Sequence, residues 1–363
     1  MDKEIDFTLS LCRFLDLDED KIKSLLSKGF DYPYVLGQLQ FNRVGGAAFY
    51  SLNKLNLLGK TNREFKNSLR TVYETNVIKS ESFKKALDYL SNIFTDVGFQ
   101  YAFLKGSHLV SLYPLGLRTS NDIDVLINFE DSSKISELLI SNGFLQGNIR
   151  NGEFIKASRA EIISSQINRG ETVPFIKEIN LPFMRFLEID INFSLDFKPE
   201  QDKSLVTELL KNTVPEIKTE HGFLNTLSPA DFLIQLCLHL YKEATVYSWV
   251  VFVRDQALYK YLDIYLFLST YINDTFTSDL IRKIKEYGVE KECYYALYRA
   301  NELFPINDKI MVDNILQSIK PDDISYLNKI IDPQSGKIYE YNMNFTEWVF
   351  CGKRRDMLHE VET

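Results

Sequence analysis

The sequence predicts an α+β protein whose central mixed β-sheet is flanked by helical regions at both ends of the chain. In the first part of the chain, apolar residues recur at every third or fourth position, as they do along the buried side of a helix. In the middle part, short apolar runs with a period of two replace this pattern, and the helical period then returns. With 363 residues the chain is long enough for two or three domains. We expect an N-terminal helical region (1–97), an α/β core (98–205) and a C-terminal helical domain (206–363).

Both helical regions carry signals for the ends of individual helices. In the first region Asp18 precedes an apolar run in the position of an N-cap, and Gly29 follows where a helix would end. The last region opens with Ser228 and Pro229, which suit the N-cap and the first position of a helix. Because the helical period then continues to near Glu360, we expect a helical domain there.

The middle region contains one clear helix and four candidate strands. The helix spans Ser132 to Ser141 and ends at Asn142 and Gly143. Apolar runs with strand character stand on either side of it, and Gly, Asn, Asp and Ser residues separate them. In chain order the candidate strands are YAFLKG, DIDVLINF, TVPFIKEI and RFLEIDINFSL.

Composition excludes several classes of protein. Lys and Arg total 42 against 50 Asp and Glu, a net charge of −8, and no basic stripe interrupts the acidic balance, which argues against a protein that grips nucleic acid. The four cysteines are scattered without metal-ligand spacing, so we expect neither a zinc site nor a disulfide framework. No apolar run is long enough to span a membrane and no signal peptide is recognisable, so we expect a cytoplasmic protein with no membrane partner.

Two aspartates open the second candidate strand. Because successive strand residues point to opposite faces, Asp122 and Asp124 share one face, roughly 6.5–7 Å apart along the strand. The apolar residues that alternate with them, Ile123 and Val125, then point together into the core. Two carboxylates so placed can hold one Mg²⁺ or bridge two.

Further polar residues accompany this pair. Gly106 lacks a Cβ and lets a phosphate approach the backbone, while Ser107 begins a short helix whose free N–H groups favour an anion. A later strand supplies a third acid, Asp190, for a two-metal site or for a base, and Glu188 on the same face is the alternative. Lys105 precedes the glycine on a strand, so we expect its side chain to point away from the site.

These motifs resemble a known superfamily. The Gly-Ser turn, the Asp-x-Asp and the later Asp are similar to the signature of the nucleotidyltransferase (DNA polymerase β-like) superfamily. More narrowly, LKGSHLVSLYPLGLRTSNDIDVLI, LEIDINFSL and LSPADFLIQLCLHLY resemble the bacterial "uncharacterised nucleotidyltransferase" family over about residues 40–270. Two departures stand out. Asn192 and Phe193 replace the family's usual His-Trp, and Glu243 stands where a second His often follows His239.

The resemblance implies roles for individual residues. Asp122 and Asp124 would hold Mg²⁺ or Mn²⁺, and Asp190 would complete the metal site or activate the acceptor. Transfer of a nucleoside monophosphate from an NTP such as ATP to a small-molecule, peptide or protein acceptor, with release of pyrophosphate, is the implied reaction. The residues implied in binding the phosphates are Gly106, Ser107, Ser120, Arg118 and, from a C-terminal helix, Lys260.

Two other functions are compatible with the same residues. A degenerate nucleotide-binding or partner-binding module would keep the fold without turnover, but such modules usually lose an acid first, and all three are present here. A glycosyltransferase would use Asp122 and Asp124 to hold a metal and a nucleotide sugar, but it has no need for Asp190 or the Gly-Ser turn. The acceptor, the preferred base and the oligomeric state are not specified by any motif in the chain.

Overall fold

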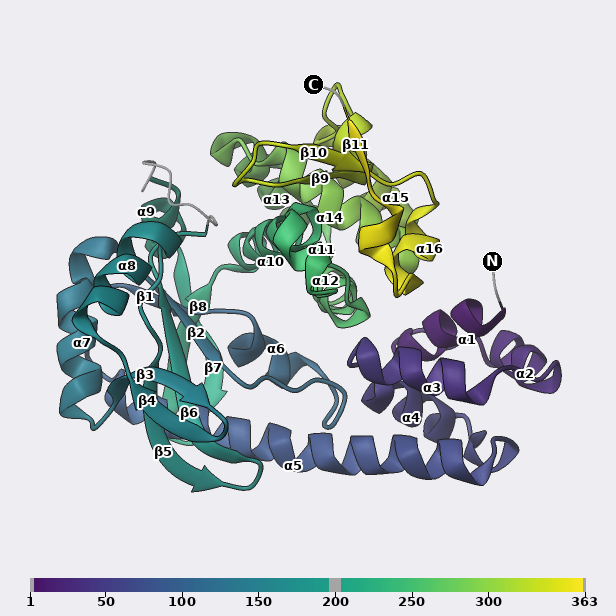
Figure 1. Ribbon diagram of the computed structural model, residues 1–363, viewed down its shortest axis with the longest axis horizontal. Helices are drawn as coiled ribbons and strands as arrows, with labels where there is room; N and C mark the ends of the chain where they lie inside the picture. The colour runs from purple at the N-terminus through teal and green to yellow at the C-terminus, as the bar shows by residue number, and fades with distance from the viewer. Residues whose placement is uncertain (1–2, 196–203, 362–363) are drawn as a thin grey trace. The chain divides into compact units, whose positions relative to one another are not determined.

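The computed structural model describes residues 3–195 and 204–361, which form two compact units (Figure 1). Unit 1 contains Met1–Thr75 and Leu233–Thr363, and unit 2 contains Asn76–Phe232. The two boundaries fall inside helices, α5 (Arg63–Ile93) and α10 (Pro229–Thr245). The three regions expected from the sequence stay a prediction about the order of elements along the chain.

Unit 2 is built on a six-stranded mixed sheet with the order β1-β2-β6-β5-β3-β4. The neighbouring strands β2 and β6 are parallel, whereas the other pairs are antiparallel. The predicted α+β class with a central mixed sheet is therefore confirmed. The strands are β1 (Tyr101–Phe103), β2 (Ile123–Ile127), β3 (Leu145–Arg150), β4 (Glu153–Lys156), β5 (Phe175–Leu181) and β6 (Met184–Asn192).

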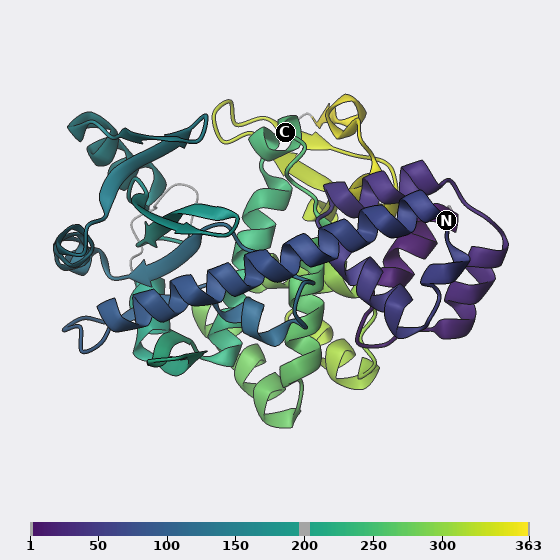
Figure 2. The ribbon, with the colours of Figure 1, turned by 90° about the horizontal axis from the view of Figure 1, so that it is seen from below.

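One face of this sheet is covered by helices and forms the core of unit 2. Ile123, Val125 and Ile127 of β2 are fully buried, as the alternation of the sequence predicts. They belong to one apolar cluster with Leu87 and Leu90 of α5 and with residues of α7 (Ser132–Ser141), whose predicted bounds are confirmed (Figures 1 and 2). Because one face packs against helices, the alternate residues of β2 and β6 are left for the opposite face.

Unit 2 also contains elements that the apolar pattern does not predict. The hairpin of β3 and β4 is largely exposed, so it lacks a regular apolar alternation. A second hairpin, β7 with β8, lies in the region expected to be helical, and Thr226 on it donates a hydrogen bond to the carbonyl of Phe103 at 2.8 Å. The remaining elements are α6 (Gly106–Leu112), α8 (Arg159–Arg169), α9 (Ser204–Lys211), β7 (Thr213–Thr219) and β8 (Gly222–Leu227).

Unit 1 is mostly helical. Its N-terminal helices are α1 (Lys3–Cys12), α2 (Glu19–Ser27), α3 (Tyr32–Phe41) and α4 (Gly45–Lys54), and the predicted N-cap Asp18 accepts a hydrogen bond from the backbone of Lys21. Its C-terminal helices are α10, α11 (Tyr247–Val251), α12 (Leu258–Tyr271), α13 (Asp274–Tyr287), α14 (Glu290–Leu303), α15 (Lys309–Ser318) and α16 (Phe345–Phe350). Within the described residues, no helix is both long and apolar enough to cross a membrane.

The expectation of a helical period up to Glu360 was wrong at the end of unit 1. A small antiparallel sheet with the order β11-β10-β9 occupies much of the segment after α15. Each of its strands has only three residues, which is too short for a period of two to stand out from a helical one. These strands are β9 (Lys329–Ile331), β10 (Ile338–Glu340) and β11 (His359–Val361).

Unit 1 contains two nearly buried ion pairs. Arg354 and Asp255 have side chains that are 1% and 0% exposed, and Arg354 Nε lies 2.9 Å from Asp255 Oδ1. Lys260 on α12 and Glu243 on α10 are also nearly buried, with Nζ 2.5 Å from Oε2. In both pairs the ion pair inside the same unit reduces the cost of burying the two charges.

Candidate active site

The parallel pairing of β2 with β6 brings two predicted site residues side by side. Asp124 and Asp190 are direct partners in the register, so their side chains leave the same face from strands about 4.8 Å apart. Ile123 pairs with Ile189, which places Asp122, just before β2, level with Glu188. The three predicted acids thus come together in space, and so does the alternative third acid.

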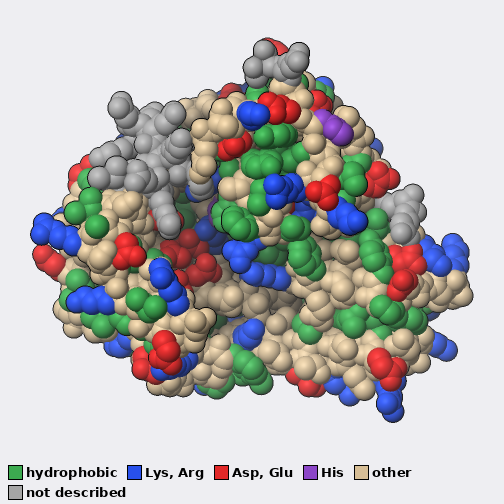
Figure 3. Space-filling view, viewed as in Figure 1, with side chains coloured by type: hydrophobic (Ala, Val, Ile, Leu, Met, Phe, Trp, Pro, Cys, Tyr) green, Lys and Arg blue, Asp and Glu red, His purple; other side chains and the backbone are tan. Residues whose placement is uncertain are grey.

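A fifth carboxylate belongs to the same group. Glu171 forms an isolated bridge with Asn192 at the end of β6 and acts electrostatically on Asp190. Glu171 is not predicted from the sequence, because the bridge that brings it to β6 lies outside the strands. We call Asp122, Asp124, Glu171, Glu188 and Asp190 the acid cluster, and Figure 3 shows acidic side chains gathered over the strands of unit 2.

The acid cluster shifts the ionisation of its own members. Burial, followed by the charge of Asp124 and then by the other acids, raises the pKa of Asp190 from its usual value to about 8. Burial and the charge of Asp122 likewise raise the pKa of Glu188. A carboxyl group with a pKa near neutrality, surrounded by like charges, is typical of functional sites rather than of structural ion pairs.

Lys105 points into the site, so the expectation that it points away was wrong. Its Nζ lies 2.8 Å from Asp124 Oδ1, and the side chain is 24% exposed. Strand alternation would place Lys105 with Tyr101 and Phe103, which are both in the apolar core. Its φ of +45°, in a region that favours glycine, reverses the direction of the side chain at the end of β1.

Asn192, which stands in place of the family's His, also contacts the acid cluster. Its Nδ2 donates to Asp124 Oδ1 at 3.3 Å and to the carbonyl oxygen of Asp190 at 3.2 Å. The same carboxylate oxygen of Asp124 therefore accepts from an ammonium and from an amide. This substitution leaves a neutral donor beside the two aspartates of the parallel strands.

The predicted phosphate-binding residues lie at the start of α6 and in the loop before β2. A Cβ at Gly106 would lie 2.2 Å from Ser120 Oγ, so the glycine is needed for the close approach of that loop. Ser107 is fully buried, and its Oγ has no hydrogen-bond partner among the described residues. Arg118 donates to the carbonyl oxygen of Thr119, and Ser120 Oγ donates to that of Asp122 at 3.3 Å. Their proposed contacts with phosphate stay a prediction.

Lys260, the remaining predicted phosphate ligand, belongs to unit 1. Besides the ion pair with Glu243, its Nζ donates to the carbonyl oxygen of Arg254 at 2.9 Å. His239 Nε2 lies 3.3 Å from the same carboxylate of Glu243. A lysine that is nearly buried and held by two acceptors has a sufficient structural role, and binding of nucleotide by Lys260 stays a prediction.

The donor set of the acid cluster fits a hard divalent cation. Mg²⁺ and Mn²⁺ prefer carboxylate oxygens, and Asp122, Asp124 and Asp190 supply them from adjacent strands. However, among residues 3–195 and 204–361 no three His, Cys, Asp or Glu side chains are arranged so that they could already hold a metal ion. Because Lys105 occupies one oxygen of Asp124, a metal would require rearrangement of these side chains.

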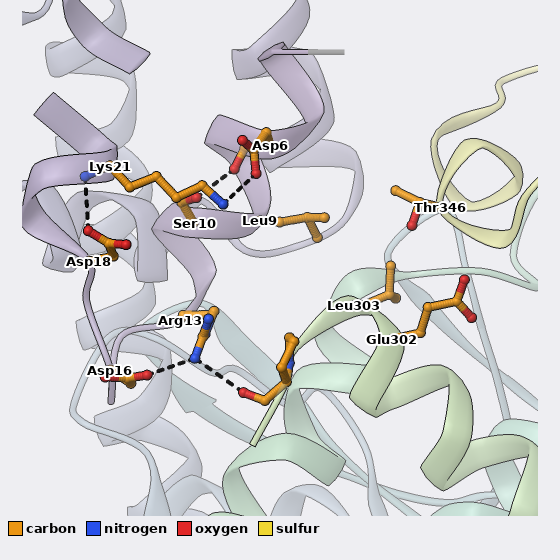
Figure 4. A pocket seen from close by; sticks show the side chains of 11 residues that line it. Asp6, Leu9, Ser10, Arg13, Asp16, Asp18, Lys21, Glu302, Leu303 and Thr346 are labelled. Atoms are coloured by element: carbon orange, nitrogen blue, oxygen red, sulfur yellow. Dashed lines mark hydrogen bonds and ion pairs between the residues drawn. The ribbon is translucent and has the colours of Figure 1, made fainter. Parts of the chain in front are cut away.

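A pocket of about 220 Å³ in unit 1 contains none of the predicted site residues (Figure 4). Two ion pairs lie along its wall, Arg13 with Asp16 and Lys21 with Asp6, each at 2.7 Å. Each of the two cations of this wall is therefore already paired with an acid. Its lining residues are Asp6, Leu9, Ser10, Arg13, Asp16, Asp18, Lys21, Glu302, Leu303, Pro305 and Thr346.

A mixed sheet with paired acids on one face fits the nucleotidyltransferases, the class of protein that the sequence resembles. Residues 28–305 match the family described as "uncharacterised nucleotidyltransferase", and the chain belongs to this family. The resemblance read from the sequence is confirmed. The chain is also similar to the crystal structure of an antigenic nucleotidyltransferase-like protein from Paracoccidioides brasiliensis, with 13% identity, 63% of this chain and 96% of that chain covered, and a TM-score of 0.34. No curated protein matches.

Proposed function

We propose that the protein transfers a nucleoside monophosphate from an NTP to a small-molecule, peptide or protein acceptor and releases pyrophosphate. The observation that carries this proposal is the register of β2 and β6, which pairs Asp124 with Asp190 beside Asp122. Membership of a nucleotidyltransferase family supports it. The net charge of −8 makes a nucleic-acid acceptor a poor fit.

Asp122 and Asp124 would hold Mg²⁺ or Mn²⁺, which would neutralise charge on the phosphates and favour departure of pyrophosphate. Asp190 would accept the proton of the acceptor hydroxyl. Its pKa of about 8 in the free protein means that it carries a proton at neutral pH, and a cation bound nearby favours the ionised carboxylate. Gly106, Ser107 and Ser120 are the residues proposed to position the phosphates, with Arg118 as their cationic partner.

The test separates transfer from binding. We expect the wild type to release pyrophosphate from at least one of the four NTPs with Mg²⁺, and Asp190→Asn to reduce this release by about a thousandfold or more while calorimetry still detects Mg·NTP. The matched control is Glu178→Gln, because Glu178 lies on the neighbouring β5 and pairs with Arg185 at 3.0 Å, outside the acid cluster. Release of UDP or GDP from nucleotide sugars, without pyrophosphate from NTPs, would establish a glycosyltransferase instead.

One observation favours a second candidate, a nucleotide-binding module without turnover. The ammonium of Lys105 forms an ion pair with the carboxylate of Asp124. A site that keeps its acids but has lost activity would be stabilised by such a cation in place of a metal. This candidate predicts that NTP binds to the wild type and to Asp190→Asn alike, with no pyrophosphate released from any NTP in either protein. The same two measurements therefore distinguish it from the enzyme.

A further inference from the structure

Lys105 has a backbone conformation that is unusual for a residue with a side chain. Its φ of +45° with ψ of −117° is a combination that glycine adopts readily and side-chain-bearing residues rarely do. The next residue, Gly106, has a negative φ and serves the approach of Ser120 instead. A backbone conformation of this kind persists where the surrounding structure imposes it, and such positions concentrate at functional sites.

The consequence of this conformation is the placement of an ammonium among carboxylates. Lys105 Nζ lies 2.8 Å from Asp124 Oδ1, the oxygen that also accepts from Asn192. Asp124 is one of the two aspartates expected to hold a divalent cation. An ammonium and a divalent cation cannot both occupy the same side of one carboxylate, because like charges at that distance repel.

We propose that Lys105 occupies the metal's place on Asp124 in the free protein and moves to the triphosphate when metal and nucleotide enter together. The inference rests on the proposed function and extends it to the order of binding. In the free protein the ammonium offsets part of the charge of the acid cluster. An incoming metal without nucleotide must displace it, which weakens metal binding. The phosphates of an NTP offer the displaced ammonium a new anionic partner, so metal and nucleotide bind cooperatively.

The side chain of Lys105 is suited to this exchange. It is 24% exposed and flexible, so it can turn about its own stem without movement of the strand. The residue directly precedes Gly106 and Ser107, the turn proposed to hold the phosphates. A short movement would therefore carry the ammonium from the carboxylate to the nucleotide.

The experiment measures Mn²⁺ binding by electron paramagnetic resonance, first alone and then with each of the four NTPs. Lys105→Met keeps the length of the side chain and removes its charge. We expect this variant to bind Mn²⁺ alone about tenfold more tightly than the wild type and Mn·NTP about tenfold more weakly. Lys105→Arg, which keeps the charge, should retain the weak binding of Mn²⁺ alone.

Two further variants serve as controls for Lys105→Met. Lys134→Met removes another lysine–aspartate ion pair of unit 2, with Asp131 at 2.7 Å, and should change neither affinity. Lys105→Gly removes the ammonium and suits the positive φ, so it should fold even if Lys105→Met does not, and it should also bind Mn²⁺ alone more tightly.

Different outcomes of this experiment would overturn the exchange at Lys105 and the proposed function. If the wild type binds Mn·NTP but loss of the ammonium in Lys105→Met and Lys105→Gly leaves the affinity for Mn²⁺ alone unchanged, the inference is overturned and the proposed function stands. If the folded wild type binds neither Mn²⁺ nor Mn·NTP, both are overturned. Tighter Mn²⁺ binding together with weaker Mn·NTP binding in the Lys105 variants supports the exchange.

Discussion

The two units bury charged side chains in opposite ways. In unit 1, Arg354 faces Asp255 and Lys260 faces Glu243, so each of these four buried charges meets an opposite charge. In unit 2, five carboxylates converge and Lys105 is the cation placed against Asp124. An opposite charge reduces the cost of burying a charged side chain, whereas like charges raise that cost unless a ligand binds them. We therefore expect the unit 1 pairs to support the fold and the acid cluster to bind a ligand.

The largest change in the free energy of unfolding is expected when a buried ion pair of unit 1 is broken. Arg354→Met leaves the carboxylate of Asp255 buried without its cation, and loss of one partner of a buried pair costs about 3–5 kcal/mol. We expect the free energy of unfolding to fall by this amount in urea denaturation. The double variant Arg354→Met, Asp255→Leu should recover most of the loss. If Arg354→Met is as stable as the wild type, the pair does not support the fold.

The next effect concerns the acid cluster and its ligand. Mg²⁺ with NTP at one hundred times Kd should stabilise the wild type by about 2.7 kcal/mol, because a ligand that binds only the native state shifts the folding equilibrium. Asp122→Asn, Asp124→Asn should abolish this gain. Without ligand, the double variant should be about as stable as the wild type, because relief of the repulsion between carboxylates is set against loss of the ion pair of Asp124 with Lys105. Thermal denaturation with and without Mg·NTP measures both, and a large loss of stability without ligand would show that these acids support the fold.

The pH dependence of stability provides a third test of the acid cluster. An aspartate titrates near 3.9 in the unfolded chain, whereas the pKa of Asp190 is raised to about 8 in the folded protein. Between these values the folded state binds the proton more strongly, so the free energy of unfolding should fall as pH rises from about 4 to 8. Urea denaturation with a chelator present should show a flatter profile for Asp190→Asn. Identical profiles for the two proteins would contradict the raised pKa.

The smallest expected change in stability distinguishes the role of Glu188 from that of Asp190. Burial and Asp122 raise the pKa of Glu188, so Glu188→Gln should relieve repulsion and raise the free energy of unfolding by less than about 1 kcal/mol. Unlike the double aspartate variant, Glu188→Gln should keep most of the stabilisation by Mg·NTP in the same thermal measurement. Complete loss of that stabilisation would make Glu188, rather than Asp190, the third acid of the metal site.

The sequence predicts the strand residues of the site because strand geometry is regular. The alternation of Asp122 and Asp124 with apolar residues indicates a strand with one buried face, and the burial of Ile123 and Val125 confirms that face. The pairing of Asp124 with Asp190 depends on the order of strands in the sheet, which no local pattern specifies. It became visible only in the register of β2 and β6.

Lys105 shows what local periodicity cannot predict. Of the two neighbours, Gly106 is the residue expected to adopt a positive φ. However, Lys105 adopts it and Gly106 does not. The reason is tertiary, because Gly106 is committed to the close approach of Ser120. Glu171 was missed for a related reason, since it reaches β6 through a single bridge with Asn192. The exposed hairpin of β3 and β4 lacks the apolar alternation on which prediction of strands depends.

The parallel pairing of β2 and β6 also has a consequence for the order in which the protein folds. Asn192 and Asp124, which touch across this pair, are 68 positions apart along the chain, and α7, β3, β4, α8 and β5 lie between their strands. Closing so long a loop carries an entropic penalty that is recovered only after the strands have paired. The helices and the β5–β6 hairpin can form earlier from local contacts. We therefore expect the carboxylates to meet late in folding, when the rest of the sheet is in place to hold them together.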